Sequence, residues 1–94
     1  MVKYQFIVVA YDIRDDKRRE KICEILSQFG RRVNYSVFEC ILKKKEILEL
    51  KRKIEKYVNK KEDTVLYYYL CQACKEKREI YGKPYPPPSM IKLI

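Results

Sequence analysis

The hydrophobic positions of this chain alternate between two periods, beginning with a strand-like run. Residues 4–11, YQFIVVAY, are mostly β-branched and aromatic, and the run is too short for a buried helix, so it predicts a central strand. Apolar residues then recur at i, i+3, i+4 and i+7, at Ile22, Ile25, Leu26 and Phe29. Asp15 is a suitable N-cap and Gly30 a suitable stop, so this segment predicts an amphipathic helix of about four turns.

The following segment repeats the same succession of elements. RRVNYSVFECIL, residues 31–42, predicts two strands joined by a reversal around residues 34–36. Residues 45–59 predict a second helix, although the preceding KKK offers no good N-cap. Its apolar side consists of Ile47, Leu50, Ile54, Tyr57 and Val58. TVLYYYL, residues 64–70, predicts a fourth strand.

The end of the chain is polar and then rich in proline. EIYG, residues 79–82, is a candidate for a short fifth strand, and Pro84 with Pro86–Pro88 favours an extended tail. We therefore predict one domain over residues 1–82 and a proline-rich tail over residues 83–94.

The predicted order is βαββαβ, which is typical of the α+β, ferredoxin-like fold with one antiparallel sheet and both helices on one face. The strands do not alternate between apolar and polar residues, as they would with one face in water. In the first strand, Phe6, Val8 and Ala10 point one way and Ile7, Val9 and Tyr11 the other. The face without helices therefore needs cover, and we predict a sheet-to-sheet homodimer that buries ~1,500 Å² or more.

Charge points to a polyanionic partner. The 94 residues contain 22 Lys and Arg against 13 Asp and Glu, a formal charge of +9. Such an excess favours nucleic acid, although a merely solvated basic surface is the alternative. The chain has no histidine, which excludes Ser/His/Asp and Cys/His catalysis and histidine metal ligands.

The lengths of the apolar runs and the positions of the cysteines indicate where in the cell the protein acts. No apolar run approaches the ~20 residues that span a bilayer, and no signal peptide is visible, so we expect a soluble cytoplasmic protein without a membrane partner. Cys23 and Cys40 fall in apolar segments, where a reduced cysteine acts as a small hydrophobe. Cys71 and Cys74 form a C-x-x-C pair, which we interpret as structural packing, with a disulfide as the alternative.

Asp12 is the candidate for chemistry. It follows the first strand, where a sheet opens into a loop, and a sheet-face dimer could bring two copies together. Mg²⁺ would relieve their repulsion, because it accepts a few carboxylate oxygens together with waters and phosphate oxygens. Such a metal would polarise a phosphate and activate a bound water. The alternative is that Asp12 only caps a turn.

Basic residues cluster near this position. Arg14, Lys17, Arg18 and Lys21 have near-helical spacing, and Arg31 and Arg32 follow the first helix. Residues 43–61 hold nine Lys or Arg against three Glu. These surfaces suit sequence-independent binding to phosphates, or, for the second helix, a solvated face with i,i+4 ion pairs.

The stretch VVAYDIRDDKRREKICEILSQFGRRVNYSVFEC, together with LYYYLCQAC, resembles the second CRISPR-associated (Cas two) family, the small partner of the CRISPR integrase. The resemblance covers residues 4–82 and excludes the tail. It implies a ferredoxin-like homodimer that binds DNA or RNA, bridges the integrase during spacer acquisition, and acts as an endonuclease that depends on Mg²⁺ or another divalent metal.

The resemblance also assigns residues. The family's metal-linked, catalytic aspartate corresponds to Asp12, and the neighbouring aromatic to Tyr11. Its basic positions correspond to Arg18, Arg19 and Arg32 or Arg31, and its third-strand positions to Ser36 and Phe38.

Three other functions compete with a nuclease. One is a DNA-binding scaffold without relevant nuclease activity. Another is an RNA-recognition module, but SVFECILK lacks the Gly and paired aromatics of that family. A ferredoxin-like metallochaperone would carry C-x-x-C in the loop where this chain has Asp12.

Overall fold

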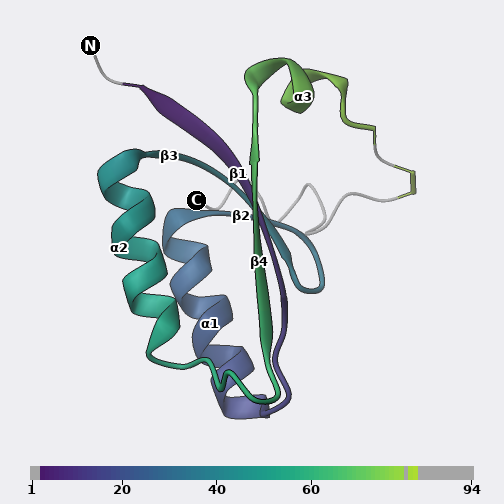
Figure 1. The fold of residues 1–94 in the computed structure, drawn as a ribbon. Helices are drawn as coiled ribbons and strands as arrows, with labels where there is room; N and C mark the ends of the chain where they lie inside the picture. The colour runs from purple at the N-terminus through teal and green to yellow at the C-terminus, as the bar shows by residue number, and fades with distance from the viewer. Residues whose placement is uncertain (1–2, 80, 83–94) are drawn as a thin grey trace.

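The computed structural model describes residues 3–79 and 81–82 and confirms the predicted βαββαβ order. The elements are β1 (Tyr4–Asp12), α1 (Asp16–Phe29), β2 (Gly30–Asn34), β3 (Val37–Lys43), α2 (Lys44–Glu55), β4 (Thr64–Leu70) and α3 (Gln72–Lys77). The strands form one antiparallel sheet in the order β2-β3-β1-β4, and α1 and α2 cover the same face of it (Figure 1). β1 is therefore an interior strand.

Helix α1 begins and ends where its sequence predicts. The Asp15 carboxylate accepts a hydrogen bond from the Arg18 backbone N–H (2.9 Å), which satisfies one free donor of the first turn. Gly30 follows the last helical residue in an extended conformation and begins β2 directly. A Cβ at Gly30 would collide with Cys40 Sγ and the Glu39 carbonyl oxygen, so glycine is required here by close approach to β3.

Helix α2 is shorter than predicted, ending at Glu55 rather than near Asn59. The reason is a competing hydrogen bond, because the Asn59 backbone N–H donates to the Asp63 carboxylate (2.8 Å). At the other end, no side chain caps the helix from Lys43, as predicted, but the Glu46 carboxylate accepts from the Lys43 backbone N–H (2.8 Å).

The main core lies between the sheet and the two helices. The odd-numbered residues of β1 and the even-numbered residues of β3 face α1 and α2, as the register of the two strands requires. Core side chains with no more than 1% of their surface exposed include Ile7, Val9, Ile22, Leu26, Phe38, Cys40, Leu50 and Ile54. This layer fixes β1, and so fixes the position of the strand end that carries Asp12.

The opposite face of the sheet, here called the open face, is also largely apolar, as predicted. The strand registers place on it Phe6, Val8, Ala10, Asp12, Val37, Glu39, Ile41, Leu66, Tyr68 and Leu70. Ile41, Leu66 and Tyr68 are 45%, 46% and 51% exposed. Tyr67 and Tyr69 point to the helix side, where the Lys51 ammonium lies 5.1 Å from each ring centroid.

The short helix α3 was not predicted. It lies on the open-face side of the sheet, beyond the end of β4 (Figure 1), and contacts β1. The Arg78 guanidinium binds Glu39 of the open face (2.8 Å). One end of this face is thus covered within the chain by a third helix, whereas the two predicted helices lie together on the other face, as expected.

The predicted fifth strand does not form at Glu79, Tyr81 or Gly82, and Ile80 and the tail of residues 83–94 lie outside the described residues. Among the residues described, no helix is both long enough and apolar enough to cross a membrane.

Candidate functional site

Asp12 is the last residue of β1, pairs with Thr64 of β4, and is exposed. None of the described residues donates a hydrogen bond to its carboxylate. Other carboxylates accept the nearby backbone N–H groups. Asp15 caps α1, and Asp63 accepts a hydrogen bond from the Arg14 backbone N–H (2.9 Å). The alternative that Asp12 is a turn cap therefore finds no support, and its carboxylate is available to an external ligand.

A hollow of about 280 Å³ lies beside Asp12 and brings several predicted residues together. It is lined by Tyr11, Asp12, Ile13, Arg19, Tyr35 and Ser36. The β2–β3 turn closes one side, where the Ser36 carbonyl accepts a hydrogen bond from the Tyr11 backbone N–H (3.0 Å). A carboxylate, a guanidinium and a tyrosine at one strand end can contact both a metal ion and a phosphate.

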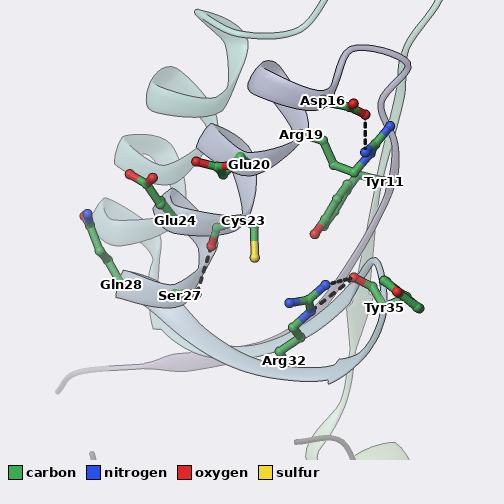
Figure 2. Close-up of a pocket in the computed structure, with 10 residues that line it drawn as sticks. All are labelled: Tyr11, Asp16, Arg19, Glu20, Cys23, Glu24, Ser27, Gln28, Arg32 and Tyr35. Carbon is green, nitrogen blue, oxygen red and sulfur yellow. Dashed lines mark hydrogen bonds and ion pairs between the residues drawn. The ribbon is translucent and has the colours of Figure 1, made fainter.

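A larger groove of about 610 Å³ continues from this hollow between α1 and β2. The Tyr11 side chain projects into the groove between Arg19 and Arg32 (Figure 2). Burial and the neighbouring Cys23 thiol raise the pKa of Tyr11 to about 12, although the two arginines oppose this shift. The phenol is therefore protonated at neutral pH and can donate a hydrogen bond, but it cannot serve as a general base.

The arginines of this groove are themselves positioned by hydrogen bonds. Arg19 binds the Asp16 carboxylate (2.8 Å) and the Ile13 carbonyl (3.1 Å), and Arg32 donates to the Tyr35 carbonyl (2.6 Å) and lies over the Tyr35 ring. These contacts hold the two guanidinium groups beside Tyr11. Both arginines could therefore bind an anionic ligand with little further loss of side-chain entropy.

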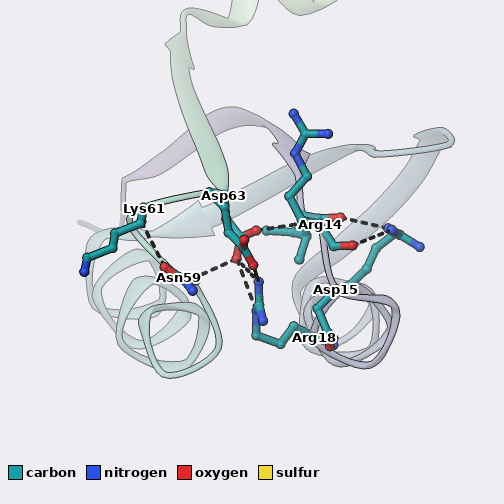
Figure 3. A network of polar contacts seen from close by, with 9 residues as sticks. Arg14, Asp15, Arg18, Asn59, Lys61 and Asp63 are labelled. Carbon is teal, nitrogen blue, oxygen red and sulfur yellow. Dashed lines mark hydrogen bonds and ion pairs between the residues drawn. The ribbon is translucent and has the colours of Figure 1, made fainter.

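A second polar network ties α1 to the segment before β4 (Figure 3). Asp63, whose side chain has no exposed surface, accepts hydrogen bonds from the backbone N–H groups of Arg14 and Asn59. The Arg18 guanidinium binds the Asp63 carboxylate (2.8 Å) and Glu62 (3.0 Å). Burial by itself would raise the pKa of Asp63, but these donors outweigh it, so the pKa is lowered.

The network separates the predicted basic residues into two groups. The Arg18 guanidinium binds two carboxylates of its own chain. A phosphate of a nucleic acid would therefore have to compete with these carboxylates for Arg18. Arg14, Lys17 and Arg31 are exposed, and the Arg14 side chain points away from Asp63 (Figure 3). Phe38, the remaining predicted position, is in the core and stacks on Tyr11 with ring centroids 6.3 Å apart.

The exposure of the cysteines agrees with the sequence interpretation for one pair and differs from it for the other. Cys40 is buried and Cys23 half-buried, as expected, but Cys71 and Cys74 are both exposed. Packing therefore does not explain the C-x-x-C pair. Residues 3–79 and 81–82 bring no three His, Cys, Asp or Glu side chains together as a metal site, so a cation at Asp12 would need ligands from outside this protomer.

Sequence reasoning missed two contributors to this region. Asp63 is 45 residues from Arg18, and nothing local reveals that they meet. Tyr35 lines both the hollow and the groove, and it could have been found from the turn that residues 34–36 predict.

Comparisons with known proteins agree on one family. The family described as CRISPR associated protein Cas2 matches residues 5–78. The CRISPR-associated endoribonuclease Cas2 3 of Synechocystis sp. is 41% identical over 87 residues, covering 89% of this chain and 95% of that protein.

Solved structures give the same result. The crystal structure of Streptococcus pyogenes Cas2 aligns with a TM-score of 0.75 and 26% identity, over 82% of this chain and 99% of that one. A chain of a partial Cas6-RT-Cas1–Cas2 complex aligns with a TM-score of 0.69 and 28% identity, over 87% and 97%. Together with the matching fold, these similarities establish that the chain belongs to the Cas2 family of CRISPR-associated proteins.

Proposed function

We propose that this protein is a cytoplasmic CRISPR adaptation protein, a homodimer that binds nucleic acid, bridges the CRISPR integrase during spacer acquisition, and carries a Mg²⁺-dependent endonuclease centre at Asp12. Two comparisons support it: a relative named as an endoribonuclease and a related chain in a complex that contains Cas1. The observation that carries the proposal is the exposed Asp12 carboxylate, which accepts no hydrogen bond from the described residues.

Asp12 suits a hard divalent cation. Mg²⁺ needs only one or two carboxylates, because waters and phosphate oxygens complete its shell, and a second copy of Asp12 across a dimer axis would supply another ligand. When bound, the ion would polarise a phosphate and lower the pKa of a water. Arg19, held beside the hollow by Asp16, would orient the phosphate group of the substrate.

The open face of the sheet supports the proposed dimer. Its exposed apolar side chains, Ile41, Leu66 and Tyr68, lie on the same side of the sheet as Asp12. Packing two open faces against each other removes these side chains from water. The same packing brings the two strand ends that carry Asp12 toward the dimer interface.

The basic surface supports binding to DNA or RNA. The chain has a formal charge of +9, and Arg14, Lys17 and Arg31 are exposed. Contacts of this kind neutralise phosphates without reading bases, as the capture of arbitrary spacer sequences requires.

Asp12→Asn tests the catalytic assignment, and Asp15→Asn is the matched control. Both variants remove one carboxylate within the same loop region, and asparagine still caps α1 at position 15. We expect Asp12→Asn to lose Mg²⁺-dependent cleavage of RNA and DNA, with a stability change within about 0.5 kcal/mol because no internal hydrogen bond is lost. Asp15→Asn should cleave normally, and retained cleavage by Asp12→Asn would refute the assignment.

A purely structural duplex-binding scaffold is the second candidate, favoured by the exposed basic side chains Arg14, Lys17 and Arg31, which can bind phosphates without a metal ion. The two functions separate when the same variants are assayed for spacer integration with the integrase. A wild-type protein that supports integration but cleaves neither RNA nor DNA with any divalent metal would establish the scaffold.

A further inference from the structure

Two thiols meet at the surface where the sheet ends. Cys71 directly follows β4, and Cys74 lies one turn later in α3, where its backbone N–H donates to the Cys71 carbonyl (3.0 Å). This turn brings the two Sγ atoms to 3.3 Å, and both residues are exposed. Two exposed thiols have no packing reason to lie this close together. Neither the proposed nuclease function nor the scaffold function uses the pair.

The buried Cys40 provides an internal comparison. Cys40 lies in the core, where burial and the neighbouring Glu39 raise the pKa of its thiol to about 11. The pKa of Cys71 is lowered instead, first by a hydrogen bond from the Cys74 thiol and then by the Cys74 backbone N–H. Thiolate is the reactive form of cysteine, so the exposed Cys71 is more reactive than the buried Cys40.

We propose that Cys71 and Cys74 form a redox-active dithiol that reacts with small-molecule disulfides. In the first step, the Cys71 thiolate attacks one sulfur of the disulfide, forms a mixed disulfide, and releases one small thiolate. In the second, Cys74 loses its proton to solvent and attacks the Cys71 sulfur, which releases the second small thiolate. The protein dithiol is oxidised by two electrons, and the small disulfide is reduced to two thiols.

The geometry favours the second step over a stable mixed disulfide. The S–S bond is about 2.05 Å long, so sulfur atoms at 3.3 Å need only a small approach to join. Helix α3 is held at its other end by the Arg78–Glu39 ion pair (2.8 Å), so the resolving Cys74 remains beside Cys71. This reaction is independent of the function proposed for Asp12.

Reaction of the reduced full chain with oxidised glutathione tests the proposal. We expect a product that is lighter by two hydrogen atoms, with two fewer thiols reactive to Ellman's reagent, and reversal by a thiol reductant. Both cysteines lie in one tryptic peptide, residues 62–75, so the loss of two hydrogens must appear in that peptide. Cys74→Ser should instead retain glutathione as a mixed disulfide on Cys71. Cys71→Ser lacks the attacking thiolate and should react with oxidised glutathione much more slowly than the wild type.

Cys23→Ser is the matched control and should oxidise like the wild type, because Cys23 lies on α1 away from the pair. As an independent measurement, phenylarsine oxide, which bridges two adjacent thiols, should bind one equivalent to wild type and to Cys23→Ser and none to either pair variant. A wild type that only accumulates glutathione adducts, or forms disulfides between chains, would overturn the proposal, as would arsenical binding that survives Cys71→Ser.

Discussion

Replacing Leu66 of the open face by aspartate should dissociate the proposed dimer. Leu66 is 46% exposed in the single chain. Complete burial of a leucine side chain contributes ~1.5–3 kcal/mol, so burying the exposed half contributes about 1 kcal/mol, and the two copies in a symmetric dimer contribute about 2 kcal/mol. Each aspartate adds a desolvation penalty of several kcal/mol, so the dissociation constant should rise by at least about 1,000-fold.

Leu48→Asp is the matched control. Leu48 lies on α2, outside the open face, and is 54% exposed, so the substitution has the same chemistry at similar exposure. Sedimentation velocity over a dilution series measures both constants, and melting curves confirm that both variants fold. A Leu66→Asp protein as dimeric as wild type, or dissociation caused by Leu48→Asp instead, would refute the sheet-to-sheet arrangement.

Three further predictions concern the network, the groove and the basic surface. Asp63→Asn should lower the melting temperature at neutral pH. Because folding lowers the pKa of Asp63 from 3.8, the difference in stability between wild type and variant should shrink as the pH falls below 3.8, as acid unfolding curves would measure. The pKa of Tyr11 is raised from 10.0 to about 12, so the stability that the protonated phenol contributes is complete below pH 10.0 and is lost as pH rises toward 12. Tyr11→Phe should therefore lose less stability than wild type between pH 10 and 12, as measured by denaturant titrations. Arg14→Ala should reduce the slope of log affinity against log salt for duplex DNA by about 0.9, measured by fluorescence anisotropy, and an unchanged slope would remove Arg14 from the interface.

The long elements could be predicted because their periodicity agrees with their final burial. Ile22, Ile25 and Leu26 face the core as their spacing indicates. α3 escaped prediction because its six residues, QACKEK, are too few and too polar to show a helical period. The end of α2 was misplaced because the competing carboxylate, Asp63, comes from later in the chain.

The candidate site was predictable only in part, for a related reason. Asp12 and Tyr11 stand in a recognisable sequence context, so their place at the end of β1 follows from the strand itself. The direction of the Arg18 guanidinium depends on Asp63 and Glu62, which approach only when β4 joins the sheet. The spacing of charged residues along the chain could not show whether Arg18 forms an internal ion pair or faces solvent.

The direct junctions between helices and strands limit how this chain can change in length. No residue separates α1 from β2 or β3 from α2. One inserted residue would rotate an adjoining helix by about 100°, because an α-helix has ~3.6 residues per turn, and would direct charged side chains into the core. Insertions, including inserted domains, should therefore not be tolerated at these two junctions.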